Sequence, residues 1–199
     1  MRVTVSIRRA GWETRRLDRF ARFGRYTRCV NAELATYRAS IDGRLRQICD
    51  ALDGLTPAQL NYRPDIEGAN SAWVLATHTL GNARAWVLGI ACGQDAVRDR
   101  PAEFASSGDD ASAFRRDAAL FSAEMTAALE QLSPADLDRR GVPSPVLWGE
   151  GPPREISARD ALLQVIEHAS LHLGHLHVTR DLARRRLSAV GSSQLTVHS

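Results

Sequence analysis

Two histidines, His168 and His172, stand four residues apart in the segment EHASLHLGHLH at 167–177. On an α-helix, four residues rotate a side chain by only about 40° and raise it by about 6 Å, so both imidazoles point the same way. Two imidazoles at this spacing can bind one divalent metal ion. Four of the six histidines of the chain lie in this segment, so a metal site is the first chemistry to consider.

His78 is the candidate for a third ligand. It lies in the middle of SAWVLATHTLGNARAWVLGIAC at 71–92, a run whose one formal charge is Arg84. A buried imidazole there needs a partner, because an unpaired polar group in a core costs roughly 1–3 kcal/mol. In an antiparallel bundle the helix with His78 can face the helix with His168 and His172. Three histidines plus water then form an open, catalytic type of metal site, whereas the alternative is three hydrogen-bonded core histidines.

Two further residues are candidates for a supporting role. His175 lies one turn beyond His172. Three roles are open to it: a fourth ligand, a residue that hydrogen-bonds to a ligand, or a core residue. We favour a residue that hydrogen-bonds to a ligand. Asn82, one turn after His78, either orients a ligand or bound water or bonds to a neighbouring helix. Glu167 points about 100° away from His168, so we expect it to be a surface charge rather than a ligand.

Hydrophobic periodicity predicts the elements that must position these residues. Apolar residues at steps of three, four and seven predict four helices, over 30–54, from Ser71 to about 92, over about 111–132, and from near Ser157 to about Leu187. The segments between them are rich in glycine, proline and polar residues and are expected to be irregular, at 55–70, 93–110 and 141–156. No strand is expected. The prediction is an all-α, up-and-down four-helix bundle with a long irregular loop before the last helix.

Charge divides the chain into a basic front and a mildly acidic remainder. Residues 1–28 hold nine arginines against two acidic residues, which gives +7 in a chain of net charge +3 and leaves −4 for the rest. We expect 1–28 to be a basic N-terminal extension, 29–188 the bundle and 189–199 a flexible tail. Three interpretations of the extension are open. It is a loosely ordered segment or an artefact of the chosen start codon, a helix that docks on the bundle, or a basic arm that binds nucleic acid or an anionic membrane. We favour the first interpretation and do not expect nucleic-acid binding.

Composition places the protein among ordinary soluble proteins. Hydrophobic residues make up 44% of the chain, and the polar centre of 71–92 argues against a membrane span. The cysteines, at 29, 49 and 92, are odd in number and widely spaced, so neither a zinc knuckle nor a disulfide framework is indicated. We expect a cytoplasmic protein.

The chain resembles the DinB-like superfamily of bacterial four-helix bundles, DUF664-like proteins included. LTPAQLNYRPDIEGANSAWVLATHTLGNARAW at 55–86 is similar to the family's second helix and the connection before it, and EISARDALLQVIEHASLHLGHLHVTRDL at 155–182 to its last helix. The resemblance covers about residues 30–187. It implies that His78, His168 and His172 bind zinc or nickel. Many members have glutamine where this chain has His175, which leaves the number of ligands open.

Relatives in this family include thiol S-transferases and isomerases that use mycothiol or bacillithiol. The resemblance therefore implies a metal-dependent thiol S-transferase whose partners are a small-molecule thiol and an electrophilic substrate. Arg63 and the loop with Trp148 are candidates for binding an anionic or aromatic group. The alternatives are a non-catalytic, stress-related metal-binding bundle and a metal-dependent hydrolase, which the absence of an obvious general base disfavours. The sequence assigns no catalytic residue beyond the ligands, and it leaves a homodimer open.

Overall fold

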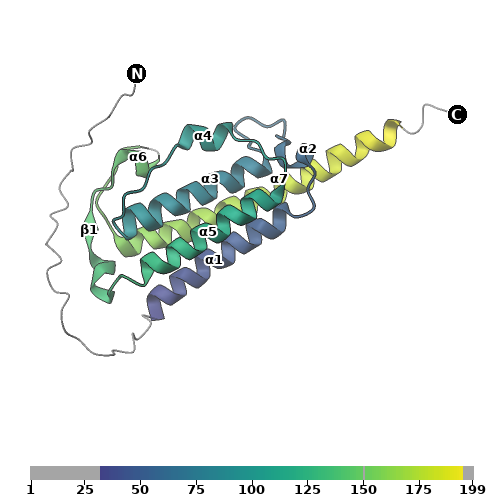
Figure 1. Ribbon diagram of the computed structural model, residues 1–199. Helices are drawn as coiled ribbons and strands as arrows, with labels where there is room; N and C mark the ends of the chain where they lie inside the picture. The colour runs from purple at the N-terminus through teal and green to yellow at the C-terminus, as the bar shows by residue number, and fades with distance from the viewer. Residues whose placement is uncertain (1–31, 150, 195–199) are drawn as a thin grey trace, which may run out of the picture.

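The computed structural model describes residues 32–149 and 151–194, and these are mostly helical (Figure 1). Four long helical segments lie side by side. They are α1 (Ala32–Leu52), α3 (Ala72–Arg84) with its π-helical continuation η1 (Ala85–Ala91), α5 (Ala111–Leu129) and α7 (Ala158–Gln194). Both α1 and α3 pack against α5 and against α7. The all-α class predicted from the periodicity is therefore present in the described residues.

Side-chain pairs show that α1 and α7 run in the same direction. Arg159 near the start of α7 donates to Glu33 near the start of α1, at 2.7 Å. Further along, Arg44 donates to Ser170 at 2.8 Å, so the two helices advance together.

The other two long helices, α3 and α5, are also parallel to each other. The Gly108 backbone, just before α5, packs against the ring of Trp73 at the start of α3. At the far end of α3, Arg84 lies 3.3 Å from Glu124 of α5. The order of directions is up, down, down, up, so the alternating up-and-down arrangement that we expected is wrong. The reason is that the segment 92–110 is no short turn: it passes back along α3 and returns the chain to the end where α3 began (Figure 1).

The connecting segments contain short elements that the sequence analysis did not predict. Helix α2 (Pro57–Asn61) begins with a capping box between Thr56 and Gln59. Helix α4 (Arg100–Ala105) is capped by Asp99, whose side chain accepts from the Ala102 N–H. The loop before α7 contains α6 (Pro145–Trp148) and two short strands, β1 (Arg140–Gly141) and β2 (Ile156–Ser157), which pair antiparallel. A 3-10 turn, η2 (Pro134–Asp138), follows α5 and begins with a capping box between Ser133 and Asp136.

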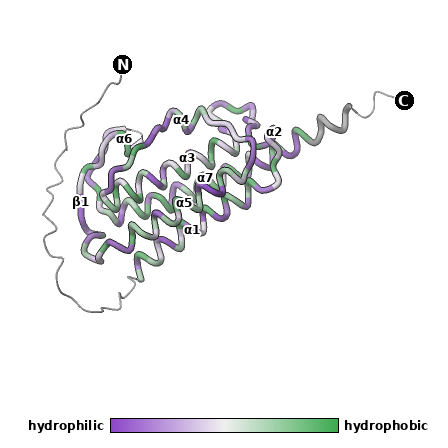
Figure 2. Tube along the Cα trace, in the orientation of Figure 1, coloured by the Kyte–Doolittle hydropathy of each residue, from purple (hydrophilic) through white to green (hydrophobic). Residues whose placement is uncertain are grey.

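The core lies between the four long helices. Figure 2 shows apolar positions recurring along these helices between polar ones, which is the pattern of helices that bury one face. The largest fully buried side chains come from all four: Ile41, Ile48, Leu52, Val74, Val87, Phe114, Phe121, Met125, Leu162 and Leu176. In the described part of the chain, no helix has both the length and the apolar character needed to cross a membrane.

Helix α7 begins where the sequence predicted and ends later. The Ser157 N–H donates to Asp160, and the Asp160 N–H donates back to the Ser157 hydroxyl, which closes the first turn. The helix continues to Gln194 rather than ending near Leu187, because adding a residue to an existing helix needs no new nucleus and gains one hydrogen bond per residue. The predicted basic extension, at 1–28, and the last five residues of the predicted tail lie outside the described residues.

Candidate metal centre

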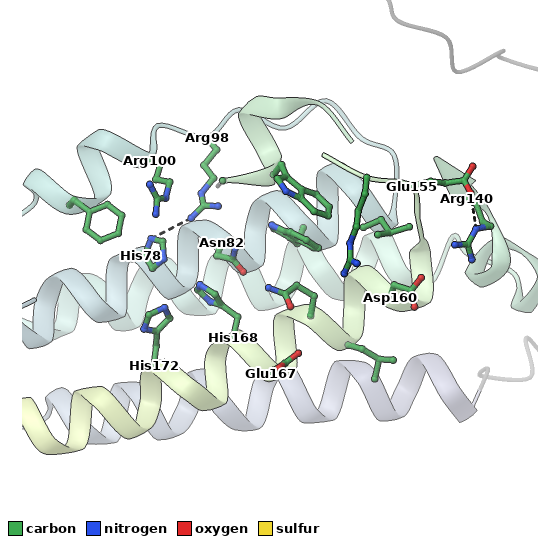
Figure 3. A pocket seen from close by; sticks show the side chains of 18 of the residues that line it. His78, Asn82, Arg98, Arg100, Arg140, Glu155, Asp160, Glu167, His168 and His172 are labelled. Atoms are coloured by element: carbon green, nitrogen blue, oxygen red, sulfur yellow. Dashed lines mark hydrogen bonds and ion pairs between the residues drawn. The ribbon is translucent and has the colours of Figure 1, made fainter. Parts of the chain in front are cut away.

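The three predicted histidines converge between α3 and α7 (Figure 3). One ring nitrogen from each of His78, His168 and His172 lies within 4.8 Å of the others. The ring centroids are 5.1 Å apart for His78 and His168, 5.2 Å for His78 and His172, and 4.4 Å for His168 and His172. The geometry follows from the antiparallel packing of α3 and α7, which sets the middle of one helix opposite the His-x-x-x-His pair of the other.

The Nδ1 atoms of the three rings have different surroundings. The Nδ1 atoms of His168 and His172 are enclosed by the protein and have no hydrogen-bond partner among the described residues. His78 Nδ1 is 2.9 Å from Glu103 Oε2. Because Nδ1 of His78 is engaged by Glu103, Nε2 is the nitrogen of this ring that is left to bind an ion. Three imidazole nitrogens are a donor set that zinc and nickel accept, so the residues present fit such an ion.

Burial keeps the α7 histidines uncharged. It lowers the pKa of His168 to about 3, with further repulsion from His172 and His78. Burial also lowers the pKa of His172 to about 4, with further electrostatic repulsion from His78 and His175. A histidine binds metal through the lone pair of its neutral form, so near pH 7 both rings are ready to act as ligands.

Glu103 and Arg98 complete the buried polar group, and the sequence analysis missed both. Glu103 lies on α4, and its two carboxylate oxygens accept from Arg98 at 2.9 Å each. Burial raises the pKa of Glu103, but the hydrogen bonds from His78 and Arg98 outweigh burial and hold the pKa below its usual value. One sequence signal does indicate a helix in this segment. Asp99 can cap a helix and Pro101 suits its first turn, so together they mark a helix start near Arg98 and Glu103, inside the expected linker.

An open cavity of about 810 Å³ lies in front of the three histidines. On one wall, Trp86 from η1 and Trp148 from α6 lie with ring centroids 5.2 Å apart. Helix α6 approaches η1 closely because position 89 is glycine; a Cβ there would lie 2.8 Å from Leu147. Charged side chains of both signs line the remainder, among them Arg98, Arg100, Arg140, Arg154, Glu155, Asp160 and Glu167. The cavity offers aromatic and cationic surface beside the histidines.

Comparison with known proteins places this fold. The sequence profile of the DinB superfamily matches residues 41–176, which is most of the chain and includes all three histidines. The chain belongs to the DinB superfamily. The fold resembles that of a DinB-like protein of Bacillus subtilis, with a TM-score of 0.50 and 22% identity over 75% of this chain and 91% of that one. A search of curated proteins finds no match. The predicted family resemblance is confirmed.

The other candidate residues of this DinB-superfamily chain differ in whether they line the cavity. Asn82 is buried and lines the cavity, and its Oδ1 has no hydrogen-bond partner among the described residues. Of the two interpretations of Asn82, a bond from this oxygen to a neighbouring helix is therefore not seen. His175 is exposed and its ring lies 5.6 Å from that of His172, outside the cluster of three. Arg63 is exposed and donates to the Phe104 carbonyl at 2.9 Å; it does not line the cavity, whereas Trp148 does.

Proposed function

We propose that the protein is a metal-dependent thiol S-transferase, with His78, His168 and His172 holding one zinc or nickel ion. The observation that carries the proposal is the convergence of three imidazoles at the wall of a large open cavity. A structural zinc site is closed by four protein ligands, and the described residues supply three within reach, as in catalytic sites. When bound, the ion supplies a Lewis acid that stabilises a thiol as its thiolate, the nucleophilic form.

The four long helices would serve as the rigid scaffold of this site, and we propose that they form the four-helix bundle of the family. Ligands from the middle of α3 and α7 are held by the core on both sides, because Ala76 and Ala169, two residues before His78 and one after His168, are buried. A site built on packed helices keeps its geometry better than one built on loops.

The cavity residues provide the means to hold two substrates. The Trp86–Trp148 wall offers flat apolar surface for an aromatic or other planar electrophile. Arg98, the most buried of the cavity arginines, is already paired with Glu103. Arg100 and Arg154 lie at the cavity surface and attract a thiol that bears carboxylates.

A hydrolase is less well supported than a transferase. Glu103 hydrogen-bonds to His78, one of the three histidines, and it also accepts a hydrogen bond from Arg98. Asp160 caps α7 and Glu155 pairs with Arg140 at 3.2 Å. A general base that must accept a proton from water needs a free lone pair facing the reaction, and these three carboxylates are already engaged. Glu167 also lines the cavity, but it is exposed and precedes His168 on α7, so its side chain leaves the helix about 100° away from that ring.

A conjugation assay tests the proposal. Purified protein is given a panel of low-molecular-weight thiols, mycothiol and bacillithiol among them, with aromatic electrophiles, and thioether formation is followed with and without a chelator. We expect turnover that the chelator abolishes and that added zinc or nickel restores. Metal binding without turnover for any thiol would instead favour a non-catalytic, stress-related metal-binding protein.

We further propose a cytoplasmic location, where such thiols are abundant. Light scattering can measure whether the protein is a homodimer or a monomer.

A further inference from the structure

Glu103 contacts His78 in a way that determines where the imidazole carries its hydrogen. His78 and Arg98 are 6% and 7% exposed, so bulk water does not compete for their hydrogen bonds. Glu103 Oε2 lies 2.9 Å from His78 Nδ1 and also 2.9 Å from Arg98 Nη2. An ionised carboxylate offers only acceptors, so Nδ1 must be the donor.

The position of the other hydrogen-bonding atoms supports this assignment. Arg98 Nη2 is 3.4 Å from the same Nδ1, but a guanidinium has only donors, so this approach of two N–H groups is not a hydrogen bond. A neutral imidazole carries one N–H. With that hydrogen on Nδ1, Nε2 keeps its lone pair and presents it to the cavity beside His168 and His172.

We propose that Glu103 is a positioning residue that holds His78 in the tautomer able to bind metal through Nε2, and that Arg98 fixes Glu103 in place. This inference deepens the proposed function and rests on it. Carboxylates that accept from metal-bound histidines fix the tautomer and ring orientation, and their loss typically weakens metal binding about 10–100-fold.

Gly81 admits the carboxylate to this position. A Cβ at residue 81 would lie 2.1 Å from Glu103 Oε1 and 2.7 Å from its carboxyl carbon. Glycine inside a helix is destabilising relative to alanine, so its presence within α3 needs a reason. The close approach of Glu103 supplies that reason, and it means that a single methyl group can displace the carboxylate while every polar side chain remains.

The first test uses metal-free protein and reads the tautomer directly. The ¹⁵N shifts of the His78 ring should show the Nδ1–H form in the wild type. In Glu103→Ala, Arg98 becomes the nearest donor to Nδ1, so His78 should change to the Nε2–H form. Gly81→Ala, which retains Arg98 and Glu103, should move it the same way and serves if Glu103→Ala does not fold. An unchanged Nδ1–H form in a folded variant would overturn the inference.

The second test measures metal affinity by chelator competition with zinc. Glu103→Ala and Gly81→Ala should each bind about 10–100-fold more weakly than wild type, because both remove the acceptor from Nδ1. Gly43→Ala is the matched control, because the nearest atom to a Cβ there is 4.0 Å away, and it should bind like wild type. Wild-type affinity in Glu103→Ala and Gly81→Ala would overturn the inference. If the wild type binds no metal, or if His78→Ala binds metal as tightly as the wild type, the proposed metal site is wrong. In that case the role of Glu103 is decided by the tautomer measurement alone.

Discussion

Acid should destabilise the metal-free protein through its buried histidines. His168 and His172 have pKa values of about 3 and 4 in the folded protein, both lowered first by burial, while the ordinary value is 6.5. Because the folded-state pKa is the lower one, the unfolded chain takes up protons first as the pH falls below about 6.5. Stability is therefore unaffected above that pH and is lost progressively below it. At about pH 5 the His168 ring costs about 2 kcal/mol, and the His172 ring costs less because it is more exposed and better screened by solvent, so the pair costs about 4 kcal/mol at most.

Urea denaturation at about pH 7.5 and about pH 5 measures this loss. Other groups also titrate, so the informative quantity is the difference between wild type and a double variant, His168→Gln with His172→Gln. Glutamine retains polarity but does not titrate, so the variant should lose less stability, by up to about 4 kcal/mol, between the two pH values. Equal losses in both proteins would refute the argument that these rings are held neutral by their surroundings.

Single substitutions at residues 175, 108 and 148 test three contacts of the site and the core. His175→Ala should keep its bound metal and His172→Ala should lose it, as measured by elemental analysis, because the ring of residue 175 lies outside the cluster; loss in both would make it a fourth ligand. Gly108→Ala should destabilise by about 1–3 kcal/mol in urea denaturation, since its Cβ would lie 2.1 Å from the Trp73 ring; a neutral effect would contradict this packing. Trp148→Ala should raise the KM for aromatic electrophiles roughly two- to tenfold with little change in kcat, and an unchanged KM would remove the aromatic wall from substrate binding.

The long helices and the three histidines could be predicted from sequence because both depend on periodicity. A buried face repeats every three to four residues, and the step from His168 to His172 follows the same repeat. His78 could be placed opposite them because one polar ring in an apolar helix requires a partner. These signals are local, and the packing of α3 on α7 then brings them together.

The parts that sequence reasoning missed depend on tertiary structure. Helix α4 has only 6 residues, too few for a repeat of buried apolar positions, so periodicity does not place Glu103 and Arg98 beside His78. The parallel direction of α3 and α5 follows from the path of the segment 93–110, which composition does not reveal. Arg63 was predicted from its position near the second helix, but its guanidinium bonds to the Phe104 carbonyl instead.

Metal content tests the central claim most directly. Protein purified without a metal-affinity tag, and incubated with zinc or nickel before desalting, should hold about one ion per chain by elemental analysis. His168→Ala should hold almost none while keeping its helical circular dichroism. A wild-type protein that retains no metal after this treatment, or a variant that retains as much as wild type, would contradict the account.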